Sequence, residues 1–224
     1  MPASQPQRLQ RLVANALIIG VALSVAGALV LRQCGVGGVT GPLLIVASTG
    51  FVALAVCLGG LHTWYGRLMI AALAFCWLGD LLGRYDFATG AVMFLLAHLV
   101  FVGAFLAHGL RLRRCIAATT LILPSAAILA WLVPQVEPAM KPLVVGYTTV
   151  ITVMLIAAAG TRQMVFAAAV VFYVSDVFVA RWRFVDHDPV NAWFCYPLYY
   201  TACTMFALSA RRTWAQQPDE TMAP

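Results

Sequence analysis

Long apolar segments follow one another along the whole chain, and only short polar connections separate them. Most of these segments hold close to the ~20 residues that a helix needs to cross about 30 Å of hydrocarbon. The third is short and the fifth contains Pro124, so seven or nine spans would also fit the pattern. We predict an all-α transmembrane bundle of about eight spans, forming one domain over residues 1–224, with helices at roughly 12–31, 42–61, 67–83, 89–110, 114–133, 140–159, 162–180 and 190–210.

The composition supports a membrane location. Hydrophobic residues make up 62% of the chain and charged residues 10%, and the mean hydropathy is +0.90. Soluble domains carry about 25% charged residues. Arginine-rich and alanine-rich usage indicates a bacterial source. For a bacterial membrane protein of this kind we expect the inner (cell) membrane.

The basic residues are distributed unequally between the two ends of the predicted bundle. Five of them fall at one end: Arg32, Arg84, Lys141, Arg181 and Arg183. Nine fall at the end that holds both termini: Arg8, Arg11, Arg67, Arg111, Arg113, Arg114, Arg162, Arg211 and Arg212. Positive charge concentrates on the cytoplasmic side of membrane proteins. We therefore predict that both termini are cytoplasmic.

Two aspartates, Asp80 and Asp176, lie inside predicted spans. A carboxylate at that depth is costly, and it usually has a partner or a function. In both segments a small residue precedes the aspartate and an aromatic residue lies three positions before it. An arginine follows Asp80 by four positions and Asp176 by five. At 1.5 Å per residue, both carboxyl groups should lie about 6–8 Å below the outer boundary.

Further polar side chains fall on neighbouring predicted helices, and a bundle can direct such groups into one cavity. They are His98, Tyr147, Ser175, Tyr199 and Tyr200. An alternative interpretation is structural. Asp80 could pair with Arg84, and Asp176 with Arg181 or Arg183, while the histidine and the tyrosines simply pack in the core.

Several classes of site are not indicated by the sequence. The histidines show neither an HxxxH nor an HExxH spacing, so we predict no metal site. The chain lacks a GxSxG motif and a glycine-rich phosphate loop, and we expect no cofactor. The positive charge follows the membrane topology rather than a soluble basic stripe, so we expect no nucleic acid. Nothing points to an obligate protein partner.

The motifs around these polar residues resemble the lysoplasmalogenase family, also called YhhN-like membrane proteins. The similarity covers about residues 67–209, and the Ser175-Asp176 block followed by Phe184 is its most specific element. The other elements are Gly79-Asp80, Gly90 through His98, Tyr147 with Met154 and Ala158, and Tyr199-Tyr200. The family usually has a glutamine where this chain has Cys203.

The resemblance implies an eight-helix enzyme that hydrolyses the vinyl ether bond of lysoplasmalogens. The products would be a fatty aldehyde and glycerophosphoethanolamine or glycerophosphocholine. Such a reaction needs one protonated acid and one nearby negative charge, which two aspartates can supply. We expect Asp80, Asp176 and His98 to be catalytic. We expect the lysophospholipid substrate, which is itself a membrane lipid, to contact Tyr147, Ser175, Tyr199, Tyr200, Arg84 and Arg183.

The substrate's shape leads to one further expectation and to an alternative function. A single-chain lipid should enter an apolar arm lined by Phe94, Phe101 and Phe172, with a polar mouth near Arg84 and Arg183. The alternative is a proton-coupled transporter or flippase, because intramembrane acids also form proton relays.

Overall fold

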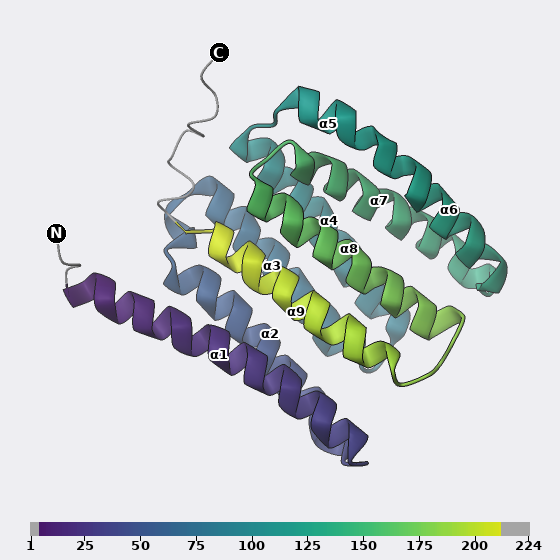
Figure 1. The fold of residues 1–224 in the computed structure, drawn as a ribbon, viewed down its shortest axis with the longest axis horizontal. Helices are drawn as coiled ribbons and strands as arrows, with labels where there is room; N and C mark the ends of the chain where they lie inside the picture. Colours follow the sequence, from purple (N-terminus) through teal and green to yellow (C-terminus); the bar gives the residue numbers. More distant parts are fainter. Residues whose placement is uncertain (1–4, 212–224) are drawn as a thin grey trace.

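The described part of the chain is helical throughout, as predicted. The computed structural model describes residues 5–211 and contains no strand in that range (Figure 1). Arg212, counted above among the cytoplasmic cations, lies outside the described residues. The helices are α1 (Gln5–Gln33), α2 (Thr40–Cys57), α3 (Trp64–Leu82), α4 (Phe87–His108), α5 (Leu112–Ala118), α6 (Ile122–Leu132), α7 (Lys141–Ala159), α8 (Gln163–Phe184) and α9 (Asn191–Ser209).

Seven segments of the described chain are long and apolar enough to cross a membrane. Helices α5 and α6 together make one of them, Leu112–Gln135. Helix α9, of 19 residues, follows these seven segments. It is less apolar than they are because it carries several tyrosines and threonines. It runs beside α8 within the bundle (Figure 1). The predicted helical membrane bundle is confirmed.

Two helices differ from their predicted form. The fifth predicted span is interrupted by a 3₁₀ turn at Thr119–Leu121, and α6 begins just before Pro124. Proline has no N–H to donate and is tolerated in the first turn of a helix, so the break precedes it. Helix α8 continues about one turn past residue 180, which places Arg181 and Arg183 on the helix rather than in a connection.

Six helices close into a ring. Each of α2, α3, α4, α7, α8 and α9 contacts the next in that order, and α9 contacts α2. Helix α1 packs outside the ring against α2 and α9, and the α5–α6 span packs outside it against α7 and α8 (Figure 1). The ring encloses the polar residues, while the outer surface is apolar. Leu23 is 67% exposed and Leu123 is 73% exposed, as expected for side chains that face lipid.

Glycines bring α3 and α4 into close contact beside Asp80. A Cβ atom added to Gly90 would lie 2.5 Å from the Cα of Gly83, so the two backbones nearly touch. A Cβ atom added to Gly79 would lie 2.7 Å from the ring of Phe94. Small residues at helix crossings permit this approach in membranes. Asp80 therefore sits where the two helices approach each other closely.

The start of α4 is fixed by Asp86. Its carboxylate accepts hydrogen bonds from the backbone N–H of Thr89 at 2.7 Å and from the Thr89 hydroxyl at 2.6 Å. These bonds, the hydroxyl's first, hold the pKa of Asp86 below its ordinary value of 3.8. A side chain that satisfies an N–H of the first turn is a standard helix cap. The cap orients the first turn of α4 beside the candidate site.

Candidate functional site

A cavity of about 690 Å³ opens at one end of the ring. Its walls come from the ends of α1, α3, α6 and α8 and from the beginnings of α2, α4, α7 and α9. These segments all lie at the end of the bundle opposite to the described N-terminal residues of α1 (Figure 1). Asp80 and Asp176 both line this cavity. The two aspartates thus occur at the same end, as their positions in the sequence predict.

Asp80 lies among hydroxyl groups. Its Oδ2 accepts a hydrogen bond from Tyr199 at 2.9 Å, and the hydroxyl of Tyr200 lies 3.3 Å away. Ser48, on α2, also donates to this oxygen. Ser48 and Tyr200 have a second acceptor in the carbonyl of Leu44. Hydroxyl donors stabilise the charged form of a carboxyl group, whereas burial opposes it.

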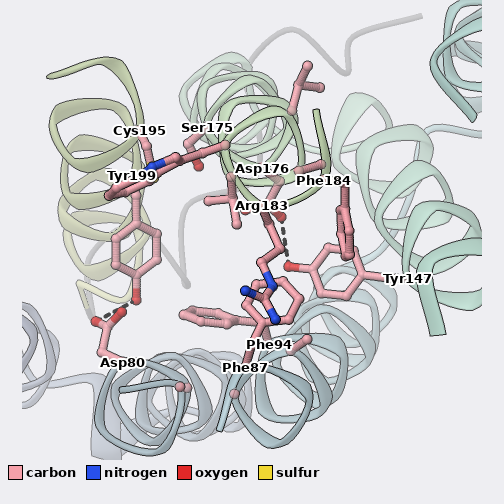
Figure 2. Close-up of a pocket in the computed structure, with 18 of the residues that line it drawn as sticks. Asp80, Phe87, Phe94, Tyr147, Ser175, Asp176, Arg183, Phe184, Cys195 and Tyr199 are labelled. Atoms are coloured by element: carbon pink, nitrogen blue, oxygen red, sulfur yellow. Dashed lines mark hydrogen bonds between the residues drawn. The ribbon is translucent and has the colours of Figure 1, made fainter. Parts of the chain in front are cut away.

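Asp176 has different neighbours. Its Oδ2 accepts a hydrogen bond from Tyr147 at 2.8 Å. The Nε2 atom of His98 lies 3.6 Å from the same oxygen. Figure 2 shows Asp80 with Tyr199 on one side of the cavity and Asp176 with Tyr147 on the other. The two carboxyl groups therefore share one cavity but not one set of partners.

The tautomer of His98 follows from its backbone contact. Its Nδ1 lies 2.6 Å from the carbonyl oxygen of Phe94, and a carbonyl can only accept, so Nδ1 carries the proton. Nε2 is buried and has no hydrogen-bond partner. The 3.6 Å to Asp176 is longer than the 2.7–2.9 Å usual for a charge-assisted bond, so this is not a tight imidazolium–carboxylate pair. In the neutral form of His98, Nε2 turns a lone pair toward Asp176.

Phe94 connects the two carboxyl centres. Its ring lies against Gly79 and packs edge to face with Tyr199, with ring centroids 5.6 Å apart. Its carbonyl oxygen accepts the hydrogen bond from His98. One residue of α4 thus contacts a partner of Asp80 through its side chain and a partner of Asp176 through its backbone.

Some of the predicted site residues line the cavity and others do not. Arg84, Arg183, Ser175 and Tyr147 line the cavity, and Arg183 extends between the two carboxyl sides in the view of Figure 2. The Ser175 hydroxyl is buried and donates to the carbonyl of Phe172 at 2.7 Å. Neither Tyr200 nor His98 belongs to the cavity wall, because each lies behind an aspartate.

The alternative ion pairs considered from the sequence are not the partners that hold the aspartates. Arg181 bonds instead to Asp186 at 2.7 Å and to Asn191 at 3.1 Å. These contacts tie the end of α8 to the beginning of α9. Asp80 and Asp176 instead accept hydrogen bonds from tyrosine hydroxyls, and both line the cavity.

The expected aromatic arm of the cavity is wrong in two of its three residues. Phe94 lines the cavity, but Phe101 and Phe172 are fully buried in the core and do not. They pack with Phe206, with ring centroids 4.4 and 6.3 Å away, and so fill the centre of the ring. The apolar wall comes instead from α6 and α7, through Ile128, Leu132, Leu143, Val144 and Ile151.

The structure also adds residues that sequence reasoning missed. Ser48 contacts Asp80, while Thr40 and Arg32 line the cavity. A serine within an apolar helix is common, and it carries no signal of its own. In residues 5–211, no group of three His, Cys, Asp or Glu side chains is placed to hold a metal ion.

The fold and the cavity define a class: a polytopic helical membrane protein with two carboxyl groups in an amphipathic cavity that opens at one end. Comparison with known proteins identifies the family. The YhhN family model matches residues 39–210, and the chain belongs to that family. The family includes lysoplasmalogenase. No curated protein and no solved structure matches the chain.

Proposed function

We propose that this protein is a membrane-embedded hydrolase that cleaves the vinyl ether bond of a lysoplasmalogen. Family membership supports a hydrolase of this kind. The observation that carries the proposal is the unequal environment of two carboxyl groups in one cavity: Asp80 lies among hydroxyl donors, and Asp176 faces a histidine lone pair. Acid-catalysed hydrolysis of a vinyl ether requires this division between a proton donor and a stabilising anion.

Asp176 is the proton donor in this mechanism. A lone pair beside a carboxyl oxygen opposes the anion and favours the acid, and His98 Nε2 holds that position 3.6 Å away. The proton of Asp176 passes to the vinyl carbon that is not bonded to oxygen. The C=C electron pair forms the new C–H bond, and the positive charge moves to the adjacent carbon and its ether oxygen as an oxocarbenium ion. Asp176 is left as a carboxylate.

Asp80 is the anion that stabilises this cation and activates water. As water attacks the oxocarbenium carbon, Asp80 accepts its proton and a hemiacetal forms. The hemiacetal then loses its hydroxyl proton to Asp176, and the C–O bond to glycerol breaks. The departing alkoxide takes the proton from Asp80. Both carboxyl groups return to their starting state, and the products are an aldehyde and an alcohol.

The shape of the cavity supports a single-chain lipid as substrate. Arginines lie at its mouth, and the apolar residues of α6 and α7 line its other wall. The bundle end that carries the cavity holds the smaller share of cations, so we place it outward, with both termini in the cytoplasm of a bacterial inner membrane. The substrate would then enter from the outer leaflet.

The test is aldehyde release by the purified protein in detergent. Lysoplasmalogen should be cleaved, whereas the matched alkyl-ether lysolipid should not, because it has no C=C bond to accept a proton. In D₂O the aldehyde should carry one deuterium on the carbon next to the carbonyl. Absence of aldehyde would refute the proposed function. Cleavage of the alkyl ether would refute the protonation mechanism.

A further inference from the structure

The first turn of α2 forms a positively polarised rim of the cavity. Helix α2 begins at Thr40, and its N-cap, Val39, offers no side-chain acceptor to the first turn. A helix N-terminus carries partial positive charge, which anions stabilise. Here the Thr40 N–H is bonded to the carbonyl of Gly37 and Pro42 has no N–H, so the turn contributes partial charge rather than a set of free N–H donors. Gly37, Thr40, Gly41 and Leu44 line the cavity, so this uncapped end faces the candidate site.

Thr40 supplies an independent sign of a missing ligand. This residue is only 8% exposed, and its Oγ1 has no hydrogen-bond partner. A buried hydroxyl without a partner is costly, so nearly all such groups in proteins are satisfied. Thr40 forms part of the cavity wall. A ligand oxygen at this rim can accept the hydrogen bond that the protein leaves unmade.

Arg84 lies directly on this turn. A Cβ atom added to Gly41 would be 2.2 Å from Nη2 of Arg84, so the guanidinium occupies the space that any other side chain would fill. A cation beside a helix N-terminus is unfavourable, since the two carry the same sign. An anion placed between them would turn this repulsion into attraction from both sides.

A second guanidinium borders the same rim. Arg32, at the end of α1, also lines the cavity, and its Cζ lies 4.7 Å from the ring centroid of Trp182. Stacking on an aromatic ring fixes the guanidinium plane and keeps its N–H donors along the edge, where one of them also reaches Tyr196. Arginine presents several donors in a geometry that matches phosphate oxygens. Arg32, Thr40 and Arg84 therefore offer the donor set of a phosphate site.

We propose that Thr40, Arg84 and Arg32, with the first turn of α2, bind the phosphodiester of the lysolipid. We call these three residues the rim triad. The inference rests on the proposed function, because it assigns one end of that substrate. Asp80 and Arg84 are four residues apart on α3 and the turn that follows it, so the glycerol side of the ether would lie toward Asp80. The hydrocarbon chain would continue past Asp176 toward the apolar wall of α6 and α7.

Three variants test Thr40 and Arg84, two members of the rim triad. Thr40→Val removes the hydroxyl, Arg84→Gln removes the charge, and Gly41→Ala displaces the Arg84 guanidinium without deleting it. Each should raise KM for lysoplasmalogen about tenfold to a hundredfold, the range expected for hydrogen bonds to a charged group. The controls are Arg113→Gln and Thr149→Val, which alter exposed residues outside the cavity. An unchanged KM in all three rim variants overturns the proposal.

A neutral substrate separates this inference from the proposed function. The wild-type protein should cleave the 1-alkenyl glycerol that lacks phosphate with a much higher KM, and the rim variants should cleave it as the wild type does. Loss of cleavage of both substrates in a rim variant would indicate a general defect and overturn the assignment to phosphate. If the wild type cleaves neither substrate, it is the proposed function that fails.

Binding without turnover gives a second readout. Glycerophosphoethanolamine should raise the melting temperature of Asp176→Asn protein in a saturable way, and adding Thr40→Val or Arg84→Gln should abolish the shift. Inorganic phosphate is the comparison ligand. A weaker shift with phosphate supports a lipid headgroup site, whereas an equal or larger shift assigns the site to free phosphate and overturns the headgroup proposal.

Discussion

The two carboxyl centres look alike in sequence but differ in the structure. Each aspartate follows a small residue, and each has an aromatic residue three positions earlier. In the structure, the indole of Trp77 donates to Thr49, whereas Tyr173 lines the cavity and donates to Ser125. The local similarity therefore does not extend to the surroundings.

The difference lies in what other helices contribute. Asp80 receives its partners from α2 and α9, and these are hydroxyls. Asp176 receives a hydroxyl from α7 and a lone pair from α4. Identical side chains can thus be given opposite roles by their neighbours alone.

The largest expected effect is loss of turnover in Asp176→Asn and in Asp80→Asn. Each should lower kcat by about 10²–10⁴-fold, since Asn can neither deliver a proton nor carry a negative charge. Melting temperatures should stay the same or rise, because functional carboxyl groups are often kept at a cost in stability. Aldehyde release measures kcat, and melting curves measure the melting temperature. Near wild-type rates in either variant would remove that aspartate from the mechanism.

Removing a hydroxyl partner should lower kcat by different amounts at the two carboxyl centres. Tyr199→Phe removes a donor from Asp80, the proposed anion, and should cost about 10–100-fold in kcat. Tyr147→Phe removes a donor from Asp176, the proposed acid, and should cost less than about tenfold by the same scale. Steady-state rates of the two purified variants give the comparison. Equal losses would contradict the unequal roles.

His98→Gln should change the pH dependence more than the rate. Gln can donate an N–H where the imidazole offers a lone pair, so it would favour the Asp176 anion. The alkaline limb of the pH–rate profile should move to lower pH, with a loss of about tenfold near neutrality. His62→Gln, at an exposed position before α3, is the control. An unshifted limb would mean that His98 does not act on the proton of Asp176.

The smallest effect concerns Asp86, an exposed aspartate that only caps a helix. Its lowered pKa means that its contribution to stability is complete above pH 3.8 and is lost as the pH falls through the lower folded value. Asp86→Asn keeps an acceptor and should leave aldehyde release unchanged at neutral pH. Below about pH 4, the wild type should lose its small stability advantage over this variant, by a few degrees in Tm at most. A large loss of activity would show that Asp86 does more than cap α4.

The sequence predicted the features that depend on single segments. Apolar length located the helices, and the cost of a buried carboxyl group singled out Asp80 and Asp176. It could not tell which phenylalanines face the cavity. Phe94 and Phe101 are seven residues apart on α4, close to two full turns, yet one lines the cavity and the other is buried. Whether a phenylalanine lines the cavity depends on its distance from the open end of the ring. That distance depends on how all six helices cross.

Contacts between distant segments were likewise hidden. Ser48 reaches Asp80 from 32 residues away. Arg84 lies on Gly41 because α2 begins at that level of the bundle, which no local pattern encodes. Residues with a common side chain and a long-range partner give no signal in one sequence.

The cavity has a charged mouth at one end of the ring and an apolar wall beside the outlying α6. An amphiphile cut at the carboxyl groups would become two fragments of opposite solubility. The glycerophospho fragment would leave through the mouth into water, and the aldehyde would leave sideways into lipid. Departure into two phases would keep the fragments from recombining and would retain the aldehyde in the bilayer. The ring would thus sort its products as it releases them.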